Sequence, residues 1–304
     1  MKVFGGLKKE KGLKELKKRN WGKSVTLLAV FSLALAVLAG CGAENSADTA
    51  RKGDKITIIG STSVGPLARS LADSFMEREK GVTVDIQEIG STEGIQAVIN
   101  GTADIGTSSR ELKEAEKEAG LGVQTIAYDG IAIVVNPANP VADLTGEQIA
   151  QIFKGEITNW QEVGGVKQQI TVVNREAGSG TRGAFQELLK LEEKQADGTK
   201  RSLITDHSLV MDSTGALKAT VAANEAAVGY LSLGVLDETV KGLKVNGVEP
   251  TLQNVKNETY AIWRPFLMLT PQGELKAQVK AYLDFIKSAE GQKIVATEKF
   301  IPVN

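Results

Sequence analysis

From residue 55 onward, short apolar runs alternate with longer segments that have the apolar spacing of amphipathic helices. This alternation is typical of an α/β fold built on mostly parallel sheets. Within the helical segments, apolar residues recur three and four positions apart, as at Leu67, Leu71 and Phe75. The predicted strands are 56–59, 83–86, 105–107, 131–136, 170–173 and 228–231.

The length of the chain predicts two lobes. It has 304 residues, of which 42% are hydrophobic, so it can bury a sizeable core. About 264 residues follow the first 40, more than one doubly wound sheet usually needs. No linker rich in Pro, Gly and Ser marks a boundary after residue 55. We therefore expect the chain to cross between the lobes more than once, with a binding site in the cleft between them.

Four segments rich in Ser, Thr and Gly each follow an apolar run and open a helical pattern: 60–66, 90–94, 177–181 and 212–215. The first turn of a helix has backbone N–H groups without internal partners and carries a partial positive charge, so it can bind an oxyanion. In open α/β sheets, ligands bind where strands end and helices begin. Arg175, four residues before Ser179, adds a planar guanidinium suited to tetrahedral oxyanions. The pattern predicts an anion site.

Two of these segments have glycine spacings that invite other interpretations. Gly178, Gly180 and Gly183 match the G-x-G-x-x-G spacing of dinucleotide-binding loops. A four-residue loop containing Arg175 separates them from the preceding strand, which disfavours a dinucleotide site. Segment 60–66 has glycines five apart, as in a P-loop, but lacks the Lys and Ser/Thr that should follow, so nucleoside triphosphate chemistry is also disfavoured.

The N-terminus has the pattern of a secretory signal. Residues 1–23 contain nine Lys/Arg and two Glu, and residues 24–40 contain no charged residue. The only cysteine, Cys41, follows Leu38-Ala39-Gly40, which resembles the lipobox of bacterial lipoproteins. We predict a signal peptide at 1–40, lipidation of Cys41, a flexible tether over 41–54, and location on the extracellular face of the cell membrane. The alternative is a plain N-terminal membrane anchor with an incidental cysteine.

Charge and composition exclude several classes of function. Without residues 1–40, the chain has 27 basic and 35 acidic side chains, a formal charge of −8 that disfavours nucleic acid as a partner. One cysteine and one histidine, His207, cannot form a His/Cys metal cluster, so no metal is expected. A Ser-His-Asp triad would need His207, which we expect in a surface loop. No catalytic residue and no cofactor are predicted, and the acidic run 111–118 is expected to be a solvated helix face.

Taken in order, these segments resemble the phosphate-binding lipoproteins of high-affinity phosphate ABC importers, which are PstS-like, class II periplasmic-type solute-binding proteins. Further matching segments are 103–110, 129–137, 152–160 and 229–232. The resemblance extends from Lys55 to Asn304. It implies two α/β lobes, each a mostly parallel sheet flanked by helices, joined by two crossover strands, with one dehydrated phosphate between them. The lobes would be residues 55–130 plus 232–304 and residues 131–231.

By position, the resemblance assigns phosphate contacts to Thr62, Ser63, Ser91 and Ser109 in the first lobe and to Arg175, Ser179, Gly180 and Thr181 in the second. Ser109 stands where longer family members have an Asp that accepts the proton of the phosphate. Such a carboxylate favours phosphate over sulfate, because sulfate has no proton to donate at neutral pH. Glu93 and Asp129 are the candidates to replace it, although Asp129 could instead brace the crossover and Glu93 could point to solvent.

The leading hypothesis is a monomeric, lipid-anchored extracellular receptor. It would bind inorganic phosphate and deliver it to the permease subunits of an ABC importer, with the lipid as its only contact with the membrane. Three alternatives remain open: a receptor of the same fold for sulfate, molybdate or tungstate, a secreted phosphoesterase, and an adhesion or sensing protein.

Overall fold

The computed structural model describes residues 54–196 and 198–303. The predicted signal peptide, Cys41 and nearly all of the predicted tether lie outside the described residues. Among the helices of the described part, none has the length and apolar composition needed to cross a membrane.

The main sheet has nine strands in the order β2-β1-β3-β13-β4-β10-β6-β9, with β11 also beside β4. These strands are β1 (Asp54–Gly60), β2 (Val82–Glu88), β3 (Ile105–Ser108), β4 (Gly122–Val135), β6 (Thr171–Arg175), β9 (Leu209–Met211), β10 (Ala227–Ser232), β11 (Lys241–Gly242) and β13 (Trp263–Thr270). Two small sheets pair β5 (Asp143–Leu144) with β12 (Lys244–Val245) and β7 (Glu192–Lys194) with β8 (Lys200–Ser202). Each of the six predicted strands overlaps a strand of the main sheet.

The helices are α1 (Gly65–Arg78), α2 (Ser91–Ile99), α3 (Glu114–Lys117), α4 (Gly146–Lys154), α5 (Gly180–Leu188), α6 (Thr214–Ala223), α7 (Leu252–Lys256), α8 (Ala277–Lys287) and α9 (Ala289–Thr297). Short 3-10 helices η1 (Trp160–Val163) and η2 (Leu233–Val235) complete the described elements. Helices α1, α2, α5 and α6 begin in or next to the four predicted segments rich in Ser, Thr and Gly.

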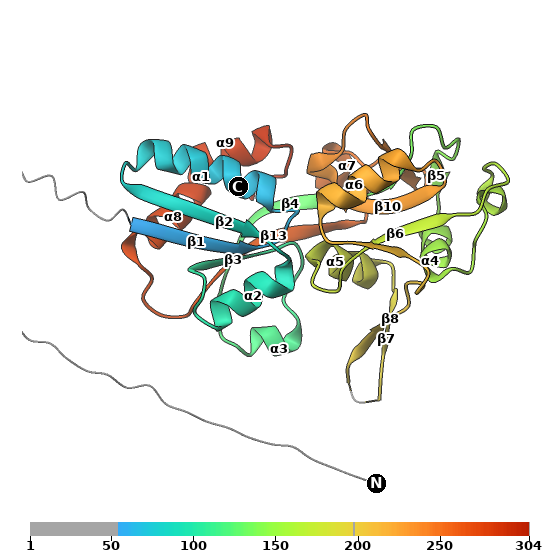
Figure 1. The fold of residues 1–304 in the computed structure, drawn as a ribbon. Coiled ribbons are helices and arrows are strands. Elements are labelled where there is room, and N and C mark those ends of the chain that lie inside the picture. The colour runs from blue at the N-terminus through green and yellow to red at the C-terminus, as the bar shows by residue number, and fades with distance from the viewer. Residues whose placement is uncertain (1–53, 197, 304) are drawn as a thin grey trace, which may run out of the picture. The chain divides into compact units, whose positions relative to one another are not determined.

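The main sheet is mixed because its middle strands run against their neighbours. Pairs β2–β1, β1–β3, β10–β6 and β6–β9 are parallel, whereas β13 and β4 pair antiparallel with each other and with β3 and β10. The parallel strands at the two ends of the sheet belong to different hydrophobic cores. We call the elements around these cores the first lobe (left in Figure 1) and the second lobe (right in Figure 1).

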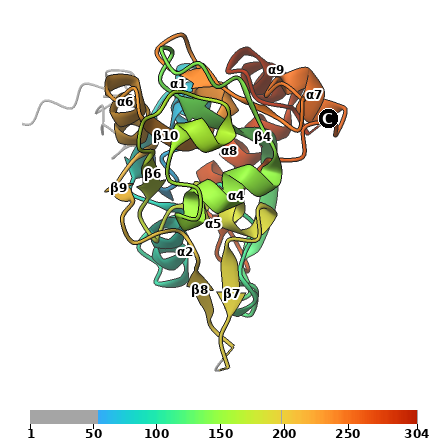
Figure 2. The same cartoon turned by 90° about the vertical axis from the view of Figure 1, so that its right-hand side faces the viewer.

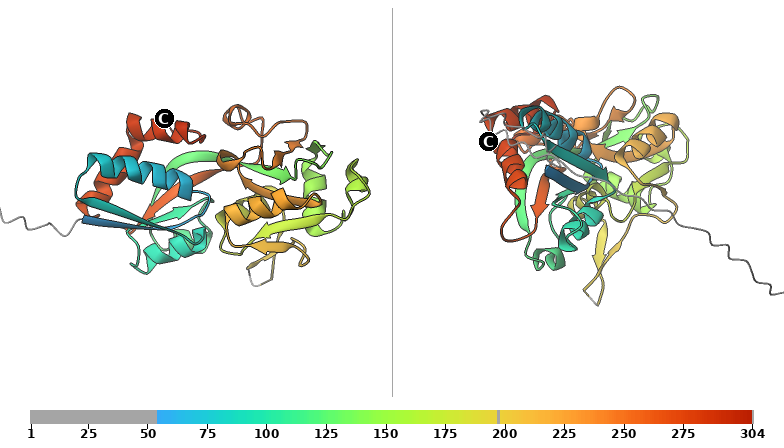
Figure 3. Two further views of the ribbon diagram at one scale, coloured as in Figure 1. Left: turned by 45° about the horizontal axis from the view of Figure 1, so that its top comes forward. Right: turned by 60° about the vertical axis from the view of Figure 1, so that its left-hand side comes forward.

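In the first lobe, helices cover both faces of the sheet (Figures 1 and 3). Neighbouring residues of a strand point to opposite faces, so the two faces can be followed along β13. Phe266 and Met268 lie in the core formed with α1, α8 and α9. Leu267 and Leu269 lie on the other side, in a cluster with Ile95 of α2. The strand ends and helix starts of this lobe are therefore held by packing on both sides.

The second lobe is also covered on two faces, as alternation along β10 shows. The Cα of Gly229 faces Leu217 and Val221 of α6. The next residue, Tyr230, stacks on Phe185 of α5 with ring centroids 4.0 Å apart. The β7–β8 hairpin, which follows α5, extends away from the sheet (Figure 2).

Strand β4 belongs to both lobes. Its first part, 122–130, pairs with β13, and its second part, 131–135, pairs with β10. The chain returns to the first lobe at the start of β13. Just before this strand, the carbonyl oxygen of Ile262 accepts a hydrogen bond from Ile131 N. Buried side chains between Leu233 and Ile262 lie in the core of the second lobe. The predicted domain boundaries stay a prediction, and this packing favours a return crossing near residue 262 over one at residue 232.

Candidate anion-binding site

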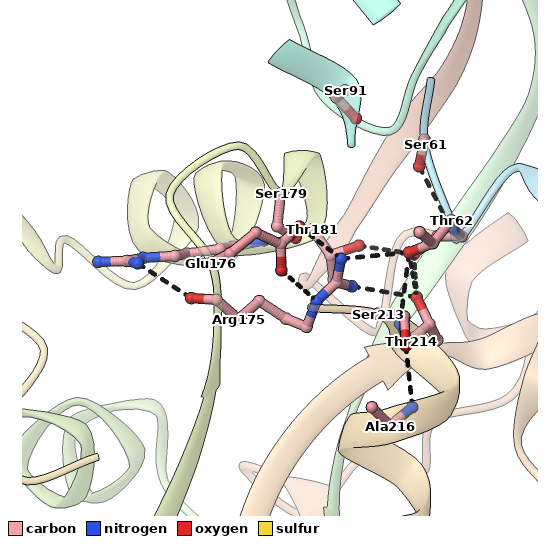
Figure 4. A network of polar contacts seen from close by, with 12 residues as sticks. Ser61, Thr62, Ser91, Arg175, Glu176, Ser179, Thr181, Ser213, Thr214 and Ala216 are labelled. Atoms are coloured by element: carbon pink, nitrogen blue, oxygen red, sulfur yellow. Dashed lines mark hydrogen bonds and ion pairs between the residues drawn. The ribbon is translucent and has the colours of Figure 1, made fainter. Parts of the chain in front are cut away.

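Hydroxyl groups from three segments of the chain meet between the lobes (Figure 4). Ser63 Oγ lies 2.8 Å from Thr181 Oγ1 and 2.9 Å from Thr214 Oγ1. Thr62 Oγ1 lies 3.1 Å from Thr214 Oγ1. Thr62 and Ser63 precede α1, whereas Thr181 and Thr214 lie in the first turns of α5 and α6. We call Thr62, Ser63, Thr181 and Thr214 the hydroxyl cluster.

A second group of hydroxyls lies on the first lobe beside the start of α5. Ser61 Oγ donates to Ser109 Oγ at 2.9 Å, and Ser109 N donates to Ser91 Oγ at 3.1 Å. All three serines are buried. A Cβ atom added to Gly180 would lie 2.2 Å from Ser91 Oγ and 2.7 Å from Ser109 Oγ. The starts of α2 and α5 therefore face each other at close range.

Local sequence explains why the helix starts have this form. Ser179 caps α5 by accepting a hydrogen bond from Arg182 N at 3.2 Å, and Ser213 caps α6 through Ala216 N at the same distance. Such caps satisfy only one of the free N–H groups of a first turn. In Ser179 the hydroxyl accepts in the cap, and the backbone N–H donates to the carbonyl oxygen of Glu176 at 3.1 Å. The backbone N–H groups of Gly180 and Thr181, next in the first turn of α5, are therefore the anion donors of this helix start.

Arg175 links the hydroxyl cluster to the second lobe. Its side chain is buried, and it donates from Nη1 to Thr214 Oγ1 and from Nη2 to Thr62 Oγ1, both at 3.1 Å. Nε and Nη2 also donate to the two carboxylate oxygens of Glu176 at 2.8 Å. This two-point contact fixes the plane of the guanidinium. The preceding strand end is held by Tyr230 Oη, which accepts from Arg175 N at 3.3 Å.

The two candidate proton acceptors lie in different surroundings. Asp129 is fully buried on β4, accepts from Arg264 Nη2 at 2.8 Å, and accepts from Gly234 N at 3.4 Å. Burial raises the pKa of Asp129, and the charge of Arg264 opposes this shift. These contacts join β4 to β13, which fits the alternative role of Asp129 as a brace of the crossover.

Glu93, in contrast, is exposed in the first turn of α2. A Cβ atom added to Gly178 would lie 2.4 Å from Glu93 Oε1, so this carboxylate lies against the loop before α5 in the second lobe. Of the two candidates, geometry favours Glu93, and its role as an acceptor stays a prediction.

The acidic run 111–118 was expected to be a solvated helix face, and this expectation is wrong for Glu116. Glu116 is buried and accepts from Arg110 Nη1 at 2.7 Å and from Nη2 at 2.8 Å. Burial alone would raise the pKa of Glu116, but hydrogen bonds from Arg110 and Lys113 N and the charge of Arg110 hold it below its ordinary value of 4.5. The run therefore fixes Arg110, the neighbour of Ser109. His207 lies in an exposed turn, as expected.

The structure brings together most of the residues that the resemblance assigned, in two adjoining groups: Thr62, Ser63, Arg175 and Thr181 in the hydroxyl cluster and its guanidinium, and Ser91, Ser109 and Gly180 where α2 meets α5. It adds Ser61, Thr214 and Glu176, which the sequence analysis did not assign to the site. Ser61 and Thr214 lie inside segments already singled out, so their hydroxyl groups were the available signal. For Glu176, the signal was an acidic residue next to Arg175.

Comparison with known proteins identifies the family. Residues 45–290 match the family model of the PBP superfamily domain. Over 296 residues the chain is 33% identical to the phosphate-binding protein PstS of Bacillus subtilis, covering 94% of this chain and 95% of that relative. The chain belongs to the PstS family of phosphate-binding proteins.

Two solved structures support the membership of this PstS-family protein. One was solved as a phosphate ABC transporter substrate-binding protein of Clostridium perfringens with bound phosphate. It is 44% identical, with a TM-score of 0.78, covering 83% of this chain and all of that chain. The other, an ABC-type phosphate transport receptor of Vibrio cholerae, is 41% identical, with a TM-score of 0.69, covering 81% and 99%. The predicted two-lobed α/β fold is thereby confirmed.

Proposed function

We propose that the protein binds inorganic phosphate between its lobes and delivers it to the permease of an ABC importer. One observation carries this proposal: Arg175 and the hydroxyl cluster gather donors from both lobes at the starts of helices. The PstS relative of Bacillus subtilis and the phosphate-bound protein of Clostridium perfringens support phosphate as the ligand.

The donors suit a tetrahedral oxyanion. Each hydroxyl of the hydroxyl cluster can rotate its proton away from its present partner and toward a phosphate oxygen. The N–H groups in the first turns of α5 and α6 and the Arg175 guanidinium add donors with positive character. Charge-assisted hydrogen bonds contribute about 1.5 to 3 kcal/mol each. Micromolar affinity needs about 8 kcal/mol, so four or five such bonds suffice after losses to ordering.

Closure of the lobes follows from the same geometry. Thr62 and Ser63 belong to the first lobe, whereas Arg175 and Thr181 belong to the second. An anion that needs donors from both lobes favours the conformation that brings them together. Closure would also exclude water and strengthen each contact. A closed, loaded receptor is the form we propose for delivery to the permease.

Selectivity against sulfate would come from a carboxylate that accepts the proton of hydrogen phosphate. We assign this role to Glu93, because Asp129 is already engaged by Arg264 and Gly234. Sulfate in the same position would meet the negative charge of Glu93 without a proton to donate. If Glu93 does not reach the anion, a receptor for sulfate, molybdate or tungstate remains the competing function.

The protein is proposed to bind and not to transform its ligand. The hydroxyls of the cluster have no histidine partner, since His207 lies in an exposed turn outside the site. A chromogenic phosphate ester provides the check: sustained release of the chromophore would favour a phosphoesterase. We also propose a monomer attached to the outer face of the cell membrane through lipid on Cys41, which the sequence before residue 54 supports.

Isothermal titration calorimetry with phosphate and sulfate tests the proposed ligand. We expect one phosphate site of micromolar or tighter affinity and far weaker binding of sulfate. No heat with phosphate would refute the proposal, and equal affinities for the two anions would refute the role of a proton acceptor. Mass spectrometry of the membrane-bound protein tests the anchor, and a mature N-terminus other than lipidated Cys41 would refute it.

A further inference from the structure

Gly178, Gly180 and Gly183 are spaced as in a dinucleotide-binding loop, and the proposed anion site accounts only for the backbone at Gly180. None of the three adopts the left-handed conformation that favours glycine. Other residues could therefore adopt their backbone geometry. Alanine is also the better helix former at positions such as Gly183, inside α5. The need for glycine must come from the surroundings.

Those surroundings belong to the first lobe at all three positions. A Cβ atom added to Gly178 would lie 2.4 Å from Glu93 Oε1, and one added to Gly180 would lie 2.9 Å from Ser91 Cβ. A Cβ atom added to Gly183 would lie 2.9 Å from Arg110 Cδ. Contacts below 3.0 Å essentially never occur for a real Cβ, so a methyl group at any of these positions must displace a neighbour.

Of the neighbours of Gly178 and Gly183, the two positions that the proposed anion site does not account for, Arg110 beside Gly183 is the less able to move. Arg110 is buried, and its guanidinium donates to both carboxylate oxygens of Glu116 at 2.7 and 2.8 Å. It also donates to Thr92 Oγ1 at 3.1 Å and to the carbonyl oxygen of Glu111 at 2.9 Å. These contacts hold the aliphatic part of Arg110 against α5. The Glu93 carboxylate is exposed and can swing away from Gly178.

A backbone hydrogen bond marks the same surface as a contact between the lobes. Thr92 N, in the first turn of α2, donates to the carbonyl oxygen of Gly178 at 3.1 Å. This bond requires the two backbones to approach closely, which a side chain on the facing residues would hinder. The first turn of α2 and Arg110 thus rest on a side-chain-free strip of the second lobe.

We propose that Gly178, Gly180 and Gly183 form the docking surface on which the first lobe closes, and that Gly183 against Arg110 sets how closely the lobes approach. This inference deepens the proposed function and rests on it for the link between closure and phosphate affinity. It assigns the G-x-G-x-x-G spacing to contact between the lobes and not to a dinucleotide.

The test compares Gly183→Ala with Gly146→Ala in the purified protein. Gly146 is the first residue of α4, and its added Cβ would meet neighbours only at 3.9 Å, so it is a matched helix-start control. Titration calorimetry measures the Kd for phosphate, and small-angle X-ray scattering measures the compaction that phosphate causes. We expect Gly183→Ala to raise the Kd about tenfold or more and to reduce the compaction, with Gly146→Ala like wild type.

Gly178→Ala with and without Glu93→Ala gives an independent test should Gly183→Ala fold poorly. Gly178→Ala alone is expected to weaken binding less than Gly183→Ala, because the Glu93 carboxylate can move. In a protein that already carries Glu93→Ala, adding Gly178→Ala should leave the Kd for phosphate unchanged, because the carboxylate that the new methyl group would displace is gone. Wild-type affinity and compaction in Gly183→Ala, or an unchanged effect of Gly178→Ala in the double variant, would overturn the docking surface.

Failure of the proposed function gives a different result. Wild-type protein that binds no phosphate would refute the function, whereas the docking surface is judged by the scattering difference between Gly183→Ala and wild type. Without phosphate binding, that difference is measured on the ligand-free proteins, for which we then expect Gly183→Ala to be the more extended. Equal dimensions would overturn the inference.

Discussion

Replacement of Arg175 by alanine is the sharpest test of the proposed site. The guanidinium is buried and connects Thr62, Thr214 and Glu176. Its removal takes away a charged donor, and the four residues of the hydroxyl cluster offer only uncharged hydroxyl groups in its place. It also leaves the Glu176 carboxylate, whose side chain is 25% exposed, without its cation and close to the bound anion. Truncating one member of such a pair costs about 2 to 5 kcal/mol, which corresponds to a Kd about 30-fold to 5,000-fold higher.

The double variant Arg175→Ala/Glu176→Ala separates the two contributions. The part of the loss that comes from the uncompensated carboxylate should be recovered, so the double variant should bind phosphate more tightly than Arg175→Ala alone. The lost hydrogen bonds to phosphate should not be recovered. Calorimetric titration of wild type and the variants measures both parts.

Arg201→Ala is the matched control, because Arg201 pairs with Glu193 in the same lobe on an exposed hairpin. Exposed pairs contribute little, and we expect wild-type affinity in this variant. Unchanged phosphate binding in Arg175→Ala would place the anion elsewhere and refute the reasoning. An equal loss in the single and double variants would refute the role assigned to Glu176.

Three further predictions concern other residues. Thr214→Val keeps the shape of the side chain but removes a hydroxyl of the cluster, so we expect a Kd for phosphate about 2-fold to 13-fold higher by calorimetry, equivalent to one hydrogen bond of about 0.5 to 1.5 kcal/mol. Ser109→Asp restores the carboxylate of longer family members, and calorimetry with both anions should show a larger ratio of phosphate to sulfate affinity; an unchanged ratio would contradict an acceptor role at this position. Because the pKa of Glu116 is held below 4.5 in the folded protein, its pair with Arg110 stabilises the fold above that pH and is lost as the pH falls through the lowered value. Urea unfolding at pH 7 and pH 3 should therefore show a smaller acid-induced loss of stability for Glu116→Gln than for wild type.

Local pattern was sufficient to predict the parts of the fold that depend on neighbouring residues. Apart from β9, which was not predicted, the parallel strands and the helix starts follow from the apolar period and from Ser, Thr and Gly at the ends of the runs. The β13 strand was missed. It contains Pro265, which cannot donate to a neighbouring strand and is unusual inside a sheet. Its pairing partner, Tyr128, lies far away in the sequence, so only the tertiary fold shows the strand.

The site was predictable as a set of segments but not as a set of contacts. Hydroxyls in 60–66 and 212–215 indicated where an anion could bind, yet nothing local shows that Thr62 meets Thr214. The burial of Glu116 has a different explanation, because its partner Arg110 is only six residues away in the sequence. The polar run does not show that Arg110 is itself buried, where it also donates to Thr92 Oγ1 of α2.

The core of the first lobe is formed by residues from both ends of the described chain. The two lobes therefore cannot fold in either order while the chain is being synthesised. Ile56 packs in the same cluster as Phe300, whereas the buried residues of the second lobe lie between Ile131 and Ile262. A chain that emerges from the ribosome or a translocation pore amino end first can complete the second lobe before the first. The first lobe must wait for β13, α8 and α9, so a nascent chain arrested after residue 262 should show protease resistance only in the second lobe.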